Sequence, residues 1–170
     1  MRPGIIRLDL WVRNQLPFVL TFALLLVALV PSRVPGFTAV VPMLPMMGVF
    51  YWAIYRPDLL PPLAAFALGL LFDLAAGTPL GVEALVFLLV QGITASQRRF
   101  FVTNTFVVAW WGFSMIAAGA TLLEWLLSAM LLAHAPDDGS AIFRYLLTVS
   151  LYPLVGWVLA RVQVLLLKAA

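Results

Sequence analysis

Three carboxylates lie within or beside strongly apolar stretches of the chain, and any chemistry would start from them: Asp73, Glu83 and Glu124. A carboxylate in the middle of a bilayer costs about 2.5–3.5 kcal/mol on the insertion scale, and less near an interface. We therefore expect these side chains to face protein or water. Acids in such places serve ion or proton transport, recognition of a partner, or the packing of a helix bundle.

The residues that would make these acids catalytic are missing from the sequence. The one histidine, His134, lies beside Asp137 and Asp138, a set that predicts at most weak metal binding. Ser114 has no convincing general base, and the chain has no cysteine, P-loop, dinucleotide fingerprint or paired-histidine zinc helix. No relay of acids and histidines crosses the membrane, which disfavours proton transport. We predict no enzymatic activity, no cofactor and no metal.

The composition places these residues in a membrane protein. Of 170 residues, 64% are hydrophobic and 10% charged, whereas soluble domains carry roughly a quarter charged residues. The net charge of +3 fits cations that mark the cytoplasmic side, so we predict no nucleic-acid partner. Arg2, Arg7 and Arg13 before the apolar run Leu16–Val30 resemble a signal peptide. No small-x-small cleavage site follows, so we expect a retained first span.

Six stretches are apolar enough, or nearly so, to cross the hydrocarbon core, which takes about 20 helical residues. They cover residues 15–30, 37–55, 59–77, 79–96, 106–132 and 143–167. Short connections of this kind are typical of antiparallel neighbours in a compact bundle. The sequence predicts an all-α polytopic fold with a single integral membrane domain over residues 1–170. The fifth span is long enough to tilt or to project beyond the bilayer.

The cations predict the orientation of this bundle. With a cytoplasmic N-terminus and six spans, most of them fall inside: Arg2, Arg7, Arg13, Arg56, Arg98, Arg99, Arg161 and Lys168. Only Arg33 and Arg144 fall outside. Five or seven spans would scramble this separation, which positively charged cytoplasmic loops produce. We predict a multi-pass protein of the bacterial cytoplasmic (inner) membrane with both termini in the cytoplasm.

The third stretch carries small residues at helical spacing. Ala65, Gly69, Asp73 and Gly77 recur every four residues and therefore share one helix face. For the glycines this pattern indicates an ordinary packing seam between helices, which in lipid is built from small residues. Asp73 stands on the same face, one turn before the end of the stretch.

The turn after this stretch, Gly77 to Gly81, separates Asp73 from Glu83. We expect Gly77 to close one helix, Thr78 to cap the next, and Pro79 to occupy the first helical position. Glu83 then lies near the helix start, where the dipole favours a negative charge. Both carboxylates are expected at the outer, periplasmic edge.

A third acid, Glu124, belongs to a stripe of small and polar residues in the fifth stretch: Ala117, Thr121, Glu124 and Ser128. Arg33 and Arg144 are the outer-side cations available to the three acids. We expect Arg144 to contact one of these carboxylates, with Asp137 and Asp138 as competitors.

The second stretch contains two prolines, Pro42 and Pro45, in its outer half. Each removes a backbone donor and clashes with the preceding turn. Two readings stay open, a kinked helix and a short helix that begins near Pro45 after irregular backbone over Gly36–Met43, which only protein or water tolerates at membrane depth. At the inner end, Tyr51, Trp52 and Tyr55 are expected to form an interfacial aromatic anchor.

Three segments carry a resemblance to a known family. Tyr51–Pro57 reads YWAIYRP, residues 69–74 read GLLFDL, and residues 77–82 read GTPLGV. In combination they resemble the MreD family of rod shape-determining membrane proteins. The resemblance is strong over about residues 48–90 and elsewhere rests on size, six spans and topology.

The resemblance implies a non-enzymatic scaffold in the elongation complex that makes peptidoglycan along the long axis of the cell. Its implied partners are the bitopic protein MreC, the actin-like MreB filament, and RodA with its class B penicillin-binding transpeptidase. It also implies a helical fold similar to the substrate-capturing subunits of energy-coupling-factor transporters.

From the residue patterns and the family resemblance together, we expect an outer groove bounded by Gly36–Pro45 and the Asp73–Glu83 turn, where MreC docks. Gly69 and Asp73 would position this groove. Arg56, Arg98 and Arg99 would face MreB or anionic lipid in the cytoplasm. The alternatives are a solute-binding subunit of a transporter, which needs a closed pocket with aromatic walls, and a protein that binds a lipid-linked precursor.

The predicted topology has a direct test. A reporter enzyme that is active only in the periplasm, fused after Lys168, should be inactive because six spans return the chain to the cytoplasm. Activity of the fusion in intact cells would contradict the predicted orientation.

Overall fold

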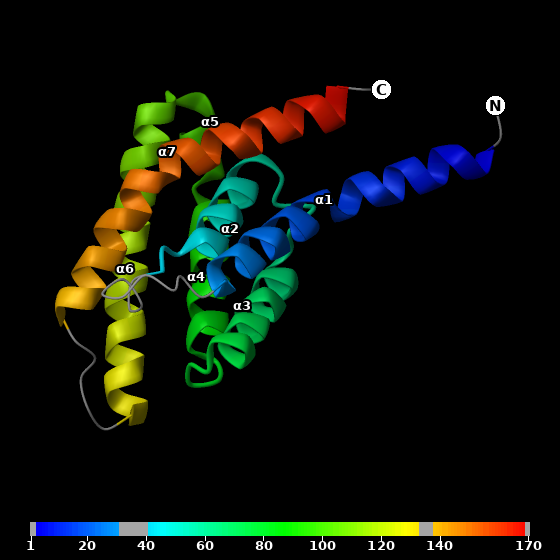
Figure 1. The fold of residues 1–170 in the computed structure, drawn as a ribbon. Coiled ribbons are helices and arrows are strands. Elements are labelled where there is room, and N and C mark those ends of the chain that lie inside the picture. Colours follow the sequence, from blue (N-terminus) through cyan, green and yellow to red (C-terminus); the bar gives the residue numbers. More distant parts are fainter. Residues whose placement is uncertain (1–2, 31–40, 133–137, 169–170) are drawn as a thin grey trace.

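The computed structural model describes residues 3–30, 41–132 and 138–168, with the side chains of residues 15–30, 41–131 and 139–165. Over these residues the chain forms seven helices and no strand (Figure 1). The helices are α1 (Pro3–Leu29), α2 (Leu44–Tyr55), α3 (Pro62–Ala76), α4 (Val82–Ser96), α5 (Arg98–Thr103), α6 (Phe106–Leu132) and α7 (Asp138–Lys168). Six of them fall on the six apolar stretches, and α5 is an additional short helix. The all-helical prediction is confirmed for the described residues.

The helices pack around α2 (Figure 1). Helices α1, α4, α5 and α7 pack against α2, α3 packs against α4 and α1, and α6 packs against α7 and α4. The start of α1, the end of α7 and α5 lie toward the upper side of Figure 1, and the turn between α3 and α4 lies at the lower side. Arg56, at the end of α2, and Arg98 and Arg99, in α5, therefore lie far from the acidic turn.

The central helix α2 is enclosed by protein. Every side chain from Pro45 to Ile54 is buried, as expected for a helix that is apolar on all faces. Phe50 lies in an aromatic cluster, with its ring centroid 5.6 Å from Phe101, 5.1 Å from Phe113 and 5.6 Å from Tyr152. These edge-to-face contacts join α2 to α5, α6 and α7.

The predicted boundary of the second stretch, residues 37–55, is wrong at its start. Residues 41–43 are not helical, and α2 begins at Leu44 with Pro45 in its first turn, where a missing N–H costs no helical hydrogen bond. The 12 residues of α2 extend about 18 Å, so the short-helix reading holds. The backbone N–H of Met43 donates to Thr148 Oγ1 of α7 at 3.1 Å. Residues 36–40 lie outside the described part.

The predicted aromatic anchor is also wrong for two of its three residues. Tyr51 and Trp52 are only 5% and 1% exposed and belong to the core, whereas Tyr55 is exposed. The Tyr51 hydroxyl donates to Gln163 Oε1 of α7 at 2.7 Å. The physical reason is that α2 lies inside the bundle, so the Tyr51 hydroxyl bonds to a protein group instead of to the membrane interface.

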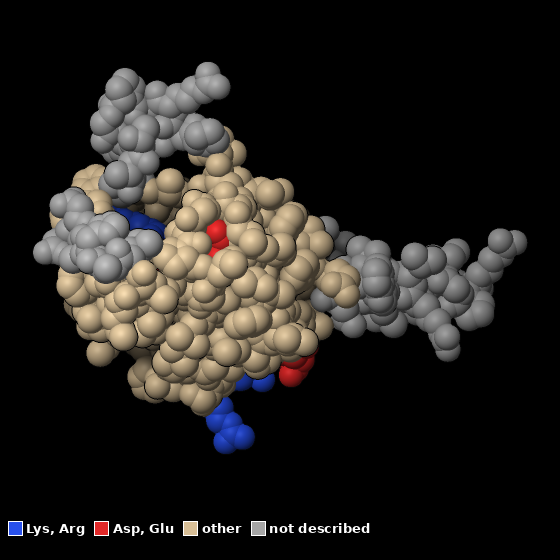
Figure 2. All heavy atoms as spheres, turned by 90° about the horizontal axis from the view of Figure 1, so that it is seen from below, with Lys and Arg blue, Asp and Glu red and all other residues tan. Residues whose placement is uncertain are grey.

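The outer surface of the bundle is apolar. Large side chains such as Leu63 (77% exposed) and Met130 (80% exposed) point away from the core, and few charged atoms are visible in the view from below (Figure 2). Two described helical segments, Phe106–Leu131 and Gly139–Leu165, are long and apolar enough to cross a membrane. At 15 residues each, α3 and α4 extend about 22 Å, which is shorter than the hydrocarbon core of about 30 Å.

The closest helix crossing lies between α3 and α4, at Gly69. A Cβ atom at this position would stand 2.4 Å from the Cα of Ala84 and 2.6 Å from the carbonyl oxygen of Glu83. Both neighbours are backbone atoms, which cannot rotate away. The packing seam predicted from the sequence is therefore internal to the protein, formed by α3 and α4.

We expect Gly69→Ala to destabilise the protein by about 1–3 kcal/mol, because the added methyl group pushes two backbones apart. Gly92→Ala in α4 is the matched control, because its Cβ would meet nothing within 4 Å and alanine favours the helix. The midpoint of thermal unfolding in detergent measures both effects. Equal midpoints for the two variants would contradict the close crossing.

Candidate functional site

Asp73, in the last turn of α3, caps the beginning of α4. Its side chain is 1% exposed. Oδ1 accepts hydrogen bonds from the Thr78 hydroxyl at 2.7 Å and from the N–H of Glu83 at 3.2 Å. Oδ2 accepts from the N–H groups of Gly81 at 2.9 Å and Ala84 at 3.4 Å. The carboxylate thus serves N–H groups that the first turn of α4 leaves without helical partners.

This arrangement corrects the predicted turn. Gly77 closes α3 as expected, with a left-handed φ of 72°. Thr78 is not the cap of α4 and Pro79 is not its first residue, because α4 begins at Val82 after Gly81 with φ of 98°. Since Asp73 supplies the acceptors from the preceding helix, no local side-chain cap is needed. In the sequence, the position of Asp73 one turn before Gly77 is the feature that indicates this capping from the preceding helix.

Arg144 of α7 lies between two carboxylates that come from two other helices. Its Nη2 is 3.2 Å from Glu83 Oε1 in the first turn of α4, and its Nη1 donates to Glu124 Oε1 of α6. The expected contact between Arg144 and a carboxylate is therefore present, and it involves two acids. Asp137 and the side chain of Asp138 lie outside the described part.

The cluster formed by Glu83, Glu124 and Arg144 brings two carboxyl groups onto one guanidinium. Glu83 is 1% exposed, and its Oε2 has no hydrogen-bond partner among the described residues. Glu124 and Arg144 also line a small pocket of about 110 Å³ together with Ser128. This pocket is polar and large enough for water. The cluster is therefore closed by protein on the side of Glu83 and faces this polar pocket on the side of Glu124.

The same part of α7 also holds the entry to α2. The hydroxyl of Thr148, one turn after Arg144, donates to the carbonyl of Arg144 at 2.7 Å and accepts the N–H of Met43 at 3.1 Å. The segment with Pro42 and Pro45 and the turn between α3 and α4 are thus both fixed on α7. Each has a structural role here.

The predicted site residues divide into two groups. At one end the structure brings together the acidic turn, the charge cluster and the proline segment: Pro42, Pro45, Gly69, Asp73, Gly77, Pro79, Gly81, Glu83, Glu124 and Arg144. At the other end lie the exposed Arg56, Arg98 and Arg99. Gly69 and Asp73 are buried against α4, so they act through the position of this helix.

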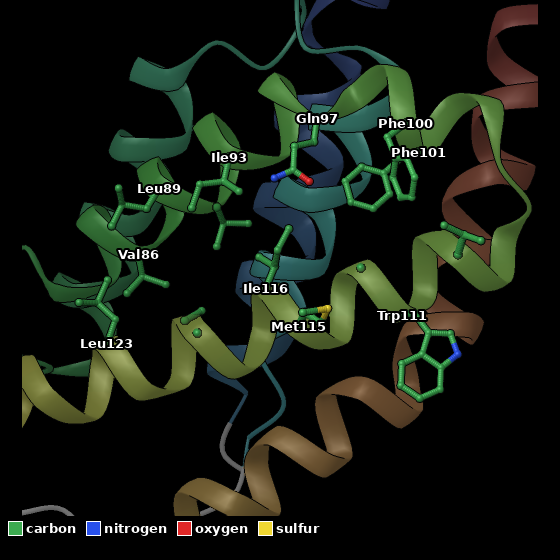
Figure 3. A pocket seen from close by; sticks show the side chains of 15 residues that line it. Val86, Leu89, Ile93, Gln97, Phe100, Phe101, Trp111, Met115, Ile116 and Leu123 are labelled. Atoms are coloured by element: carbon green, nitrogen blue, oxygen red, sulfur yellow. The ribbon is translucent and has the colours of Figure 1, made fainter.

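Two apolar surfaces were missed by the sequence reasoning. One is a groove of about 600 Å³ between α4, α5 and α6, which Figure 3 shows. The other is an open hollow of about 470 Å³ between α6 and α7, lined by Ala118, Thr121, Leu122, Trp125, Ala141, Ile142 and Tyr145. In an apolar chain, residues that face lipid and residues that line a groove have the same composition, so no signal separates them.

The contact of Ser114 indicates a role in helix packing. Its Oγ lies 2.8 Å from the hydroxyl of Tyr145, which joins α6 to α7. Within the described residues, no three His, Cys, Asp or Glu side chains are grouped as metal ligands. The acids are held by Arg144 or by backbone N–H groups, and this arrangement positions helices.

We expect Arg144→Met to destabilise the protein by about 3–5 kcal/mol, because it leaves two carboxylates near each other without their cation. The combined variant Glu83→Gln, Glu124→Gln, Arg144→Met should recover most of this loss, since no net charge stays buried. Arg98→Met, at an exposed arginine, is the control. Thermal unfolding in detergent gives the order. A combined variant no more stable than Arg144→Met would contradict the charge argument.

Comparison with known proteins gives one family. The family model described as rod shape-determining protein MreD matches residues 12–162. Comparisons with curated proteins and with solved structures find no significant match, so the likeness to energy-coupling-factor subunits stays a prediction. The matched range includes the acidic turn, the charge cluster and the described apolar surfaces. The chain belongs to the MreD family of rod shape-determining proteins.

Proposed function

We propose that the protein is a non-enzymatic scaffold of the rod-shape elongation complex, that it binds MreC, and that it couples peptidoglycan synthesis to cell shape. Membership of the MreD family supports the role in shape determination. The observation that carries the binding proposal is the open hollow between α6 and α7, which adjoins the charge cluster.

In the proposed topology the six helices other than α5 lie within the inner membrane, and α5 lies at its cytoplasmic surface. The separation of Arg56, Arg98 and Arg99 from the acidic turn supports this orientation, because cations favour the cytoplasmic side. The shorter α3 and α4 then require a locally thinned bilayer on their side of the bundle, which costs fractions of a kcal/mol per ångström.

The hollow between α6 and α7 has the chemistry that helices use to associate in lipid. Small residues, Ala118, Thr121 and Ala141, lie between the larger Leu122 and Ile142. Small residues let a second helix approach closely, and nearby polar groups add contacts. The polar pocket supplies such groups, because it shares part of its lining with the hollow. The single membrane helix of MreC is the proposed occupant.

In this mechanism the charge cluster sets the angle between α6 and α7, and MreC binds the surface that these two helices form. RodA with its transpeptidase would bind other apolar faces, and MreB would approach Arg56 from the cytoplasm. No chemical step occurs. The described pockets are open to the surface, which favours a partner helix over the closed solute pocket of a transporter subunit.

Site-specific crosslinking tests this placement. A photoreactive amino acid at Leu122 or Ile142 should capture MreC in native membranes, because both side chains are exposed in the hollow. The same amino acid at Leu63, which is exposed on α3, is the matched control. Captured proteins are identified by mass spectrometry.

Capture of MreC at Leu122 and Ile142 but not at Leu63 supports the proposal. Equal capture at all three positions would show that the hollow is not the binding surface. Recovery of an ATPase pair and a coupling subunit instead of MreC would show that the protein serves transport.

A further inference from the structure

The groove between α4, α5 and α6 shares no lining residue with the charge cluster or with the hollow used above. Val86, Leu89 and Ile93 of α4 and Ile116 and Leu123 of α6 line its two sides (Figure 3). Its volume of about 600 Å³ lies within the range of roughly 300–1,000 Å³ that is common for ligand sites. Leu89 and Ile93 are substantially exposed, so no side chain of the described residues covers them.

The floor of the groove is kept open by glycine. Gly119 of α6 lines the groove, and a Cβ atom there would meet nothing within 4 Å. At the α5 end the space is filled, because the ring of Phe101 lies so close to Gly112 that a Cβ would stand 2.2 Å from it. The groove is therefore open along α4 and α6 and closed at one end by α5.

Polar groups gather only at the closed end. Gln97 is the one polar side chain among the lining residues, and Phe100 and Phe101 stand beside it (Figure 3). Arg98 and Arg99 do not line the groove themselves; they are exposed on the same short helix, between Gln97 and Phe100. Among the described residues neither guanidinium has an acidic partner.

We propose that this groove binds an anionic phospholipid, with an acyl chain along α4 and α6 and its phosphate at Arg98 and Arg99. The groove is apolar along its length and two exposed cations of α5 lie beside its closed end, an order that matches the acyl chain and phosphate of the lipid. A membrane-spanning partner helix would have to continue past α5, whereas a lipid ends there in its headgroup. The proposal shares with the proposed function only the placement in the membrane.

Each arginine near an anionic headgroup is expected to contribute about fivefold in affinity. The acyl chain supplies the remainder by filling apolar space beside Gly119. Removal of the cations should therefore reduce the preference for anionic over zwitterionic lipid, and filling the groove should abolish retention of either lipid.

The test uses the full chain, purified in detergent and mixed with phosphatidylglycerol or with phosphatidylcholine of the same acyl chains. Native mass spectrometry measures the fraction of protein that retains one lipid. The variants are Gly119→Leu, which fills the groove, and Arg98→Gln with Arg99→Gln, which removes the cations. Gly92→Leu is the matched control, because Gly92 is an equally open helical glycine that does not line the groove.

The wild type and Gly92→Leu should retain phosphatidylglycerol at least tenfold better than phosphatidylcholine. Gly119→Leu should lose retention at least tenfold, and the double arginine variant should retain the two lipids about equally, because two contributions of about fivefold each are lost. Size-exclusion profiles and unfolding midpoints equal to those of Gly92→Leu show that the variants are folded.

Equal retention of the two lipids by the wild type would overturn the proposal. So would Gly119→Leu behaving like Gly92→Leu, because the bound lipid would then lie elsewhere. Loss of MreC capture in Gly119→Leu with unchanged lipid retention would assign the groove to a protein helix and would also overturn it. A normal MreC crosslink at Leu122 in a variant that no longer retains lipid would separate this proposal from the proposed function.

Discussion

The position of α4 relative to α6 and α7 depends on the guanidinium of Arg144. Burying carboxyl groups in a bundle is costly unless they gain a cation or hydrogen-bond donors, and Arg144 supplies both to Glu83 and Glu124. Glu83 also begins α4, whose N–H groups are held by Asp73. A single arginine thus orders three helices, and its acidic partner connects it to the turn that ends α3.

Polar contacts have a particular value in lipid, where helices gain nothing from simply hiding apolar surface from water. A bundle made only of apolar contacts has many arrangements of similar energy. Here the hydrogen bonds of Asp73 and Thr148 and the ion pairs of Arg144 have fixed directions, so they select one arrangement. The close crossing at Gly69 is compatible with that arrangement because Gly69 itself places no side chain between the two backbones.

The sequence predicted what depends on charge and chain length, and missed what depends on which side of a helix faces protein. The apolar stretches locate the helices, and the scarcity of outer cations pointed to Arg144. Tyr51 and Trp52 were placed at the interface because an aromatic pair near an arginine looks the same in the core and in a membrane belt. Thr78 has the sequence position of a cap, but the true acceptor, Asp73, belongs to the previous helix. The grooves could not be predicted, since lipid-facing and groove-lining residues are equally apolar.

Because α2 is enclosed by other helices, its residues are surrounded by protein and not by lipid. For the buried residues from Pro45 to Ile54, the surroundings are other side chains, as in the interior of a water-soluble domain. In a membrane, bilayer thickness and lipid type would act directly on the exposed helices α6 and α7. The packing of α2 depends only on the size and shape of the neighbouring side chains. Tolerance to substitution should therefore follow hydrophobicity on α6 and exact size on α2, although these two helices are equally apolar in composition.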